Sequence, residues 1–322
     1  KIRFLDVMRD HKITQLTTSS VEPVRRGDFI ETDCGVVCKT RDGQLGVKSD
    51  HFKVISAFKG VHFPDRKMGD AECERHIDLL ANASSNLIFR QRADIINTIR
   101  GYLVARGFLE VETPILSKNA NGATARPFQT KAMDETELYL RIAPELYLKR
   151  LIVGGFEKVF EIGKVFRNEG VDATHNPEFT SLELYQSFAY FDDLLEMVKE
   201  LFDSFAGDGS LRIKQHIDIL RVLQENNIDI DLTSDIRAQL EHYTKLHNLF
   251  DPQKTDSKLF DRLVGKFVEP QCQVPTILTG FPIFTSPLAA ANPQNPLLAD
   301  RLEVFVDGKE MANGYQEWRD LG

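Results

Sequence analysis

The chain has 322 residues, 42% of them hydrophobic and 27% charged, which is the composition of an ordinary globular protein with room for two domains. No apolar run is long enough for a membrane-spanning helix, so the sequence predicts none. The net charge of −8 argues against a protein that coats nucleic acid generally, although a local basic face can bind RNA on an acidic body.

The sequence begins at Lys1 without an initiator methionine, and it shows no signal peptide. We therefore expect an upstream segment beyond this sequence. We also expect a protein of the cytoplasm or the mitochondrial matrix and not a secreted one.

Residues 1–62 have the short apolar segments and turn residues of an all-β module. A strand over 28–33 precedes Val36-Val37, and Asp42-Gly43 is a strong hairpin signal before the next strand. A further strand is predicted over 53–55. A small β-module of this kind either binds single-stranded nucleic acid by stacking and backbone charge or is purely structural.

A linker with a charged helix is expected over 63–86, and the remaining chain, 87–322, then opens with a long amphipathic helix. This helix ends near Gly107, which is a natural C-terminal stop. A short strand over 109–113 follows it and is closed by a proline. The apolar residues at helical spacing in the long helix are Ile95, Ile96, Ile99 and Leu103.

A second amphipathic helix is predicted over 192–205, and a weakly patterned polar segment follows it. For that segment, 206–258, we expect a small helical insertion. The stripe of the second helix consists of Leu194, Val198, Leu201 and Phe205.

The segment 166–185 is the most informative part of the chain and is typical of two strands joined by a polar loop. Arg167 and Glu169 share strand parity, so we expect both side chains on the same face of the sheet. A face that carries a guanidinium, carboxylates and an aromatic ring suits a planar, anionic ligand bound together with a cation. The second strand adds Phe179, Ser181, Glu183 and Tyr185 to this face, and the core face is expected to hold Val165, Leu182 and Leu184.

Residues 302–310 are typical of a two-residue β-hairpin, because Asp307-Gly308 lies between strand-forming residues. This turn pairs Glu310 with Phe305 and places Glu303 two residues along on the same face. The two glutamates are then diagonal neighbours about 7–8 Å apart at the backbone. Two like charges at that spacing need a cation between them, and oxygen ligands suit Mg²⁺. The alternative is a pair of solvated glutamates at a strand edge.

Four ordered blocks resemble class II aminoacyl-tRNA synthetases, and the lysyl family in particular. FRNEG at 166–170, THNPEFT at 174–180 and ELY at 183–185 are similar to motif 2. GFLEVETP at 107–114 is similar to motif 1. The remaining two blocks, similar to lysyl-family sequences, are APELYLKR at 143–150 and GKEMANGYQE at 308–317.

The resemblance implies roles for individual residues of an ATP site. It assigns Arg167 to the α-phosphate and to the carboxylate of the amino acid, which a guanidinium can bridge. Glu169 would accept a hydrogen bond from the adenine amino group, Phe179 would stack under the ring, and His175 would reach the γ-phosphate. Asn176 and Glu310 would complete the ATP contacts, and Mg²⁺ would bind to Glu303 and Glu310.

The resemblance also implies a lysine-binding pocket. Glu317 and Tyr185 would bind the ε-ammonium, since an unpaired buried carboxylate rejects a neutral side chain. Asn313 and Glu317 have the opposite strand parity to Glu310, so all three can line one pocket only if a bulge or bend separates Glu310 from Asn313. The remainder of the amino acid would be bound by Glu145, Glu183, Asn313 and the backbone of Gly122.

The implied fold is α+β, with a class II synthetase antiparallel β-sheet flanked by helices after an incomplete all-β OB-fold anticodon-binding domain at 1–62. The implied activity is ATP-dependent activation of L-lysine to lysyl-adenylate, with Mg²⁺, and transfer of lysine to the 3′ end of its tRNA. A homodimer would form through the helix and strand of motif 1. Motif 3 of the family is absent before Gly322, and we expect it in residues beyond this sequence.

Three other functions stay open on the sequence. Aspartyl and asparaginyl synthetases share the architecture, but an acidic pocket would repel an acidic side chain. A ligase that attaches lysine to an elongation factor lacks an OB domain, whereas residues 1–62 resemble one. A non-catalytic tRNA-binding paralogue is favoured by the absence of motif 3 and disfavoured by the set Arg167, Glu169, Glu303 and Glu310.

Overall fold

The structure is a computed structural model that describes residues 2–9, 12–32, 35–40, 43–57, 59, 75–119, 122–123, 125–205 and 210–318. The chain divides into two compact units, Lys1–Ile96 and Asn97–Gly322. The expected domain limits at residues 62 and 86 stay a prediction, and the part of the expected linker at 63–74 lies outside the described residues. No helix within the described ranges is long and apolar enough to cross a membrane.

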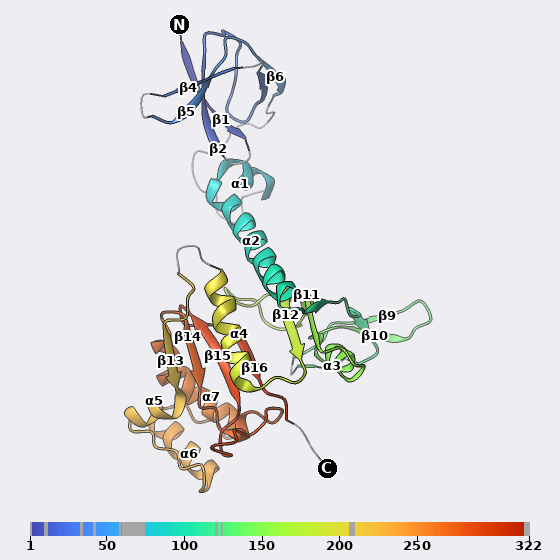
Figure 1. Ribbon diagram of the computed structural model, residues 1–322, viewed down its shortest axis with the longest axis vertical. Coiled ribbons are helices and arrows are strands. Elements are labelled where there is room, and N and C mark those ends of the chain that lie inside the picture. Colours follow the sequence, from blue (N-terminus) through green and yellow to red (C-terminus); the bar gives the residue numbers. More distant parts are fainter. Residues whose placement is uncertain are drawn as a thin grey trace. The chain divides into compact units, whose positions relative to one another are not determined.

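The first unit is built mainly from short strands, as the sequence predicts (Figure 1). Leu16 and Phe52 are buried between them. Gly43 has a φ of 78° in the turn between two of the strands, a conformation that favours glycine. One sheet has the order β1 (Arg3–Arg9), β2 (Lys12–Thr18), β5 (Leu45–Lys48), β4 (Val36–Lys39), and a second pairs β3 (Phe29–Thr32) with β6 (Phe52–Ser56). This all-β arrangement is consistent with an OB-fold.

Helices α1 (Arg75–Ala81) and α2 (Ala83–Ala105) follow. The chain leaves α2 through Gly107, whose φ is 82°. Leu103 is fully buried and packs with Phe108 of the following segment. The expected strand at 109–113 is shorter than predicted, since β7 contains only Leu109–Glu110.

The second unit contains a three-stranded sheet of order β12 (Glu178–Gln186), β11 (Lys158–Phe166), β7. Strands β11 and β12 are antiparallel, and Leu182 and Leu184 of β12 pack into the core with Phe160, as expected. Val165 is buried, as expected, but the face predicted for it is wrong. Val165 pairs directly with Phe179 and therefore lies on the same face as the predicted site.

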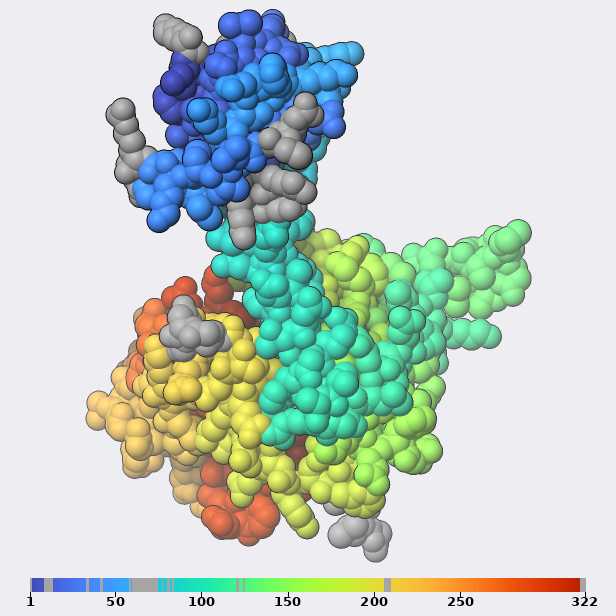
Figure 2. Space-filling view, turned by 45° about the horizontal axis from the view of Figure 1, so that its top comes forward, coloured from blue at the N-terminus to red at the C-terminus, as the bar shows by residue number. Residues whose placement is uncertain are grey.

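A small sheet and a helix lie next to these strands in the sequence. The sheet has the order β8 (Leu116–Ser117), β10 (Glu137–Leu140), β9 (Gln129–Lys131), and α3 (Glu145–Val153) follows it. The β9–β10 hairpin, drawn in green, projects from the body of this unit in Figure 2. Met133, which lies between these two strands in the sequence, is fully exposed.

A four-stranded sheet forms the rest of the second unit, with helices on both faces (Figure 1). Its order is β13 (Gln215–Asp218), β14 (Thr276–Thr279), β15 (Arg301–Val306), β16 (Lys309–Tyr315), and all pairs except β13–β14 are antiparallel. Helix α4 (Phe191–Ser204) covers one face, where its Val198 and Phe202 pack on Leu302 and Val304. This helix matches the prediction for 192–205. The other face is covered by α5 (Ile219–Glu225) and α7 (Asp256–Phe267), with short 3₁₀ turns at η1 (Glu269–Gln271) and η2 (Ile283–Thr285).

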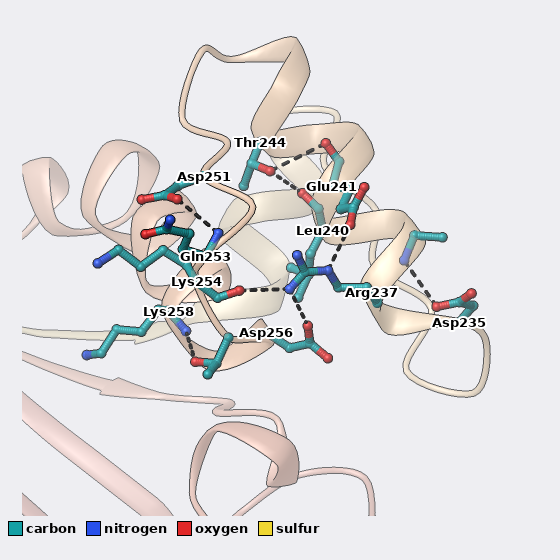
Figure 3. Close-up of polar contacts among 12 residues, drawn as sticks. Asp235, Arg237, Leu240, Glu241, Thr244, Asp251, Gln253, Lys254, Asp256 and Lys258 are labelled. Carbon is teal, nitrogen blue, oxygen red and sulfur yellow. Dashed lines mark hydrogen bonds and ion pairs between the residues drawn. The ribbon is translucent and has the colours of Figure 1, made fainter.

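The segment 206–258 is helical, as expected, but it is more than a small insertion. It contributes β13 to the sheet, and α5 and α6 (Ile236–Leu246) bury Leu223 and Leu240 in the largest core cluster. Side-chain contacts fix the two helix starts shown in Figure 3: Asp235 caps α6, and Arg237 donates to the carbonyl of Lys254 and to Asp256 at the start of α7. Residues 206–209 lie outside the described part of the chain.

Candidate active site

A buried ion pair fixes the strand that leads to the site. Arg141 and Glu161 are 4% and 5% exposed in their side chains and are joined by a 2.6 Å contact between Nη1 and Oε1. Arg141 also donates to the carbonyl of Lys164, and Thr113 donates to the second carboxylate oxygen of Glu161. Because each charge is paired and hydrogen-bonded, the network fixes β11 against the segment after β7 without leaving a buried charge unsatisfied.

Arg167 follows β11 directly, and its backbone is hydrogen-bonded to the residue that precedes β12. Its backbone N–H donates to the carbonyl of Pro177 at 2.8 Å, which extends the β11–β12 ladder by one bond. Its guanidinium carbon lies 5.2 Å from the ring centroid of Phe179, which is a cation–π arrangement. The structure therefore brings the predicted phosphate-binding Arg and the predicted adenine-stacking ring together.

The strand parity expected for Glu169 is wrong, because β11 ends at Phe166. Glu169 is exposed in the loop that follows, and its N–H donates to the carbonyl of Arg167. The alternation of faces that holds within a strand does not extend through this loop.

The loop between β11 and β12 carries His175 and Asn176, both exposed. Asp172, which no sequence pattern singled out, orders it: Nδ1 of His175 lies 2.8 Å from Oδ2 of Asp172, and Thr174 bonds to the same carboxylate. Backbone and side-chain hydrogen bonds from Thr174 and His175 hold the pKa of Asp172 well below its usual range. The His175 ring is thus oriented by a carboxylate beside the predicted phosphate site.

Carboxylates of β12, of the start of α3 and of the segment after β16 lie close together, and we refer to Glu145, Glu183 and Glu317 as the acidic pocket. Burial, reinforced by the nearby carboxylate of Glu145, raises the pKa of Glu183 to about 7, and the charge of Arg167 opposes the shift. The hydroxyl of Tyr185 donates to Glu183 at 3.3 Å. Burial and the surrounding carboxylates raise the pKa of Tyr185 far above its ordinary value, so this phenol stays a neutral donor.

Gly122 lies next to Ala143 and Glu145 at the start of α3. Its φ is 100°, and a Cβ atom at this position would meet the Cβ atoms of Ala143 at 3.3 Å and of Glu145 at 3.4 Å. Both observations favour glycine here, since any side chain would be strained and would crowd the carboxylate-bearing helix start.

Lys149 is a pocket residue that sequence reasoning missed. Its Nζ lies 2.6 Å from Oε1 of Glu145 and 3.0 Å from Oε1 of Glu317, and 5.8 Å from the ring centroid of Tyr185. Burial lowers the pKa of Lys149, but the hydrogen bonds with Glu145 and Glu317 outweigh it and leave a raised pKa. The signal available in the sequence was the i,i+4 spacing of Glu145 and Lys149 on one helix.

The β15–β16 hairpin forms as predicted, with Phe305 opposite Glu310. The register then shifts between Val304 and Phe305, so that Asn313 lies opposite Glu303. The bulge that the sequence required between Glu310 and Asn313 is therefore confirmed. Glu303, Glu310 and Asn313 share one face of the sheet.

Arg301 is a second residue that sequence reasoning missed. Its Nη2 donates to Oε1 of Glu303 at 2.5 Å and its Nε to Oδ1 of Asn313 at 3.3 Å, and the guanidinium carbon lies 4.4 Å from the ring centroid of Phe281. Burial raises the pKa of Glu303 to about 7, with Arg301 opposing and Glu310 reinforcing the shift. Arg301 thus partly neutralises the predicted metal-binding pair.

The donor set of Glu303 and Glu310 fits a hard divalent cation. Burial raises the pKa of Glu310 as well, so a cation that kept both carboxylates ionised would relieve an electrostatic cost. In the described part of the chain, no cluster of three or more His, Cys, Asp or Glu could hold a metal ion. The protein would therefore supply two carboxylates, and phosphate oxygens would have to supply further ligands.

Arg167 connects the two sheets of the site electrostatically. Burial is the main cause of the raised pKa at both Glu183 and Glu310, and the charge of Arg167 lowers the pKa of each. One guanidinium is thus close enough to act on both Glu183 of the acidic pocket and Glu310 of the hairpin. Such a site can hold an amino acid with a cationic side chain next to a polyphosphate.

Comparison with known proteins agrees with this geometry. The chain belongs to the class II aminoacyl-tRNA synthetases, because residues 71–321 match the family described as tRNA synthetases class II (D, K and N). Among curated relatives, the probable cytoplasmic lysine–tRNA ligase of Enterocytozoon bieneusi (strain H348) is 39% identical over 92% of this chain and 64% of its own. The lysine–tRNA ligase of Dehalococcoides mccartyi (strain 195) is 35% identical over 99% of this chain and 70% of its own.

A further relative, the lysine–tRNA ligase of Helicobacter pylori (strain Shi470), is 40% identical over 87% of this chain and 60% of its own. The chain therefore spans between 60% and 70% of the length of these relatives. The resemblance seen in the sequence is confirmed at the level of the family.

Proposed function

We propose that the protein is a lysine–tRNA ligase, which activates L-lysine with ATP and transfers it to the 3′ end of tRNA. The observation that carries this proposal is the acidic pocket of Glu145, Glu183 and Glu317 beside Arg167. A cationic amino acid suits the pocket, and its carboxylate and a phosphate suit the guanidinium. The names of the relatives support the same assignment.

In the first reaction the carboxylate of lysine attacks the α-phosphate of ATP, forms lysyl-adenylate and releases pyrophosphate. The attacking group is already ionised, so the chain has to supply position and charge and no general base. Arg167 binds the α-phosphate and the lysine carboxylate, and Phe179 supports the adenine ring. Glu169, His175 and Asn176 are proposed as further ATP contacts, as the resemblance implies.

In the same proposal Glu317 and Tyr185 bind the ε-ammonium, while Glu145, Glu183, Asn313 and the backbone of Gly122 bind the rest of lysine. Mg²⁺ would be held by Glu303 and Glu310, where it would neutralise phosphate charge. In the second reaction a hydroxyl at the 3′ end of tRNA attacks the carbonyl carbon of the adenylate and releases AMP.

The partners and the location of the protein are proposals too. The all-β part at 1–62 is proposed to bind the anticodon of tRNA, and helix α2 with β7 is proposed to form a homodimer. A location in the cytoplasm or the mitochondrial matrix stays a prediction.

The proposal is tested by amino-acid-dependent exchange of pyrophosphate into ATP, measured on the full-length protein with lysine, aspartate and asparagine in turn. Exchange that depends on lysine alone supports it. Exchange driven by aspartate or asparagine would point to the other members of the family, for which the carboxylates of the pocket are unsuited. A protein that catalyses no exchange but binds tRNA would be a non-catalytic relative.

A further inference from the structure

The ammonium group of Lys149 lies among residues that are proposed to bind the side chain of the substrate. Its nitrogen contacts Glu317 at 3.0 Å and lies 5.8 Å from the ring centroid of Tyr185, and these are the two residues assigned to the ε-ammonium of lysine. We propose that Lys149 is an internal occupant of the pocket, which holds Glu317 in the ligand-free protein and is displaced from it when lysine binds. This inference rests on the proposed function.

The two ion pairs of Lys149 differ in origin. The pair with Glu145 is local, because both residues lie on α3 at i,i+4 spacing, and it can persist in any state of the pocket. The pair with Glu317 is tertiary, since Glu317 follows β16. A ligand that competes for Glu317 can therefore break the second contact while Lys149 keeps the first.

The competing groups are chemically identical. The side chain of residue 149 and the side chain of free lysine both carry an ammonium on four methylene groups. The raised pKa of Lys149 keeps it charged at neutral pH, so the exchange replaces one ammonium by another at the same carboxylate. Glu317 therefore has an ammonium partner both before and after the exchange. This avoids the cost of leaving its half-buried charge unpaired.

This arrangement affects specificity. Burial raises the pKa of Glu317 and the hydrogen bond from Lys149 lowers it, so the resident ammonium favours the ionised carboxylate before any substrate arrives. A neutral amino acid cannot replace an ammonium on Glu317, and it would have to enter a pocket that Lys149 still fills. Lys149 therefore acts as a specificity-determining residue, and its occupancy of the pocket weakens the binding of lysine itself.

The test is the affinity of the full-length protein for L-lysine, measured by isothermal titration calorimetry at pH 8. Lys149→Met removes the charge and keeps most of the volume, and we expect the Kd for lysine to fall by about tenfold, the scale of one lost competing contact. Lys149→Arg keeps a competing cation and should leave the Kd unchanged or higher. Lys149→Gln serves as a second neutral variant if the Met variant does not fold, as judged by thermal melting.

Lys245→Met is the matched control, because Lys245 forms an i,i+4 pair with Glu241 at 2.8 Å on α6, outside the site. Its Kd should equal that of the wild type. A second measurement, of the Kd for ATP, separates competition from a structural effect. The neutral variants should bind ATP as the wild type does, whereas a general change in the structure of the site would alter the affinity for both ligands.

The outcomes distinguish the inference from the proposed function. Wild-type protein that binds no lysine would overturn the proposed function and the inference together. Wild-type protein that binds lysine, with unchanged or weaker binding by the folded neutral variants, would overturn the inference alone and make Lys149 a supporting counter-ion.

Discussion

In the β15–β16 ladder, Glu303 lies directly opposite Asn313, and Phe305 lies directly opposite Glu310. A step of two residues along β15 therefore matches a step of three residues along β16. One residue of β16 therefore has no counterpart on β15, and that residue is Met311, whose side chain is 53% exposed. This single extra residue brings Asn313 onto the face of Glu310. The set of side chains in the proposed lysine site thus depends on a backbone irregularity.

Insertion of an alanine between Val304 and Phe305 should give Met311 a partner, remove the bulge and place Glu303 and Asn313 on the face opposite to Glu310. An extra residue in a strand moves every side chain beyond it to the other face, so we expect loss of lysine-dependent pyrophosphate exchange. Deletion of Met311 also removes the bulge, but it leaves Glu310 and Asn313 two residues apart with the same strand parity, and it should retain exchange. Near-normal exchange by the insertion variant would show that Asn313 does not need to share a face with Glu310.

Glu317→Gln should weaken lysine binding, because it removes the carboxylate assigned to the ε-ammonium. Glu317 is 40% exposed in its side chain, so solvent screens the interaction and the expected rise in KM for lysine is about tenfold, or ~1.4 kcal/mol. The KM for ATP should change little. Steady-state exchange kinetics measure both, and an unchanged KM for lysine would remove Glu317 from the head-group site.

Arg167→Lys keeps the charge but loses the planar fork that can bridge a phosphate and a carboxylate. We expect kcat for adenylate formation to fall by about 10²-fold, the scale seen when one donor to a developing charge is removed. Lys164→Ala is a suitable control, since Lys164 pairs with Thr180 on the other face of β11. Single-turnover formation of lysyl-adenylate measures the effect, and equal rates for Arg167→Lys and wild type would contradict the assigned role.

The parts of the site that are local in sequence were predictable. The hairpin at Asp307-Gly308 fixes its own register, and the opposite parity of Glu310 and Asn313 requires a bulge if both residues line one pocket. Val165 was placed on the wrong face because parity within one strand does not determine which residues of the next strand share its face. That relation depends on the register, which pairs Val165 with Phe179.

Lys149 and Arg301 were missed for a different reason. Lys149 contacts Glu317, and Arg301 contacts Asn313. Each acceptor is distant in the sequence from its donor, so only the folded chain brings the two together. The segment 206–258 was underestimated because its buried residues belong to a short strand and short helices. No single period of 2 or 3.6 residues runs through it, so periodicity alone could not reveal that it supplies much of a core.

Glu183 should make the stability of the ligand-free protein fall with rising pH. Burial raises its pKa from 4.5 to about 7 in the folded state, so the folded state favours the protonated carboxyl. Its contribution to stability is fully present below about pH 4.5 and is lost as the pH rises through about 7. Urea unfolding at pH 5 and pH 8 should show that Glu183→Gln gains stability relative to wild type at pH 8 and little at pH 5. Glu178→Gln, at the exposed start of β12, is the control, and a pH-independent difference for Glu183→Gln would contradict the shift.

Gly163→Ala should destabilise the protein through the buried ion pair. A Cβ atom at Gly163 would lie 2.3 Å from Nη2 of Arg141 and 3.0 Å from Oε1 of Glu161, so the guanidinium would have to move. Breaking a buried pair on one side leaves an uncompensated charge, and we expect the free energy of unfolding to fall by about 3 kcal/mol. Gly101→Ala is the control, because nothing lies within 4 Å of a Cβ atom there and alanine favours the helix by up to about 1 kcal/mol. Denaturant unfolding measures both variants, and equal stability of Gly163→Ala and wild type would mean that the network tolerates displacement of Arg141.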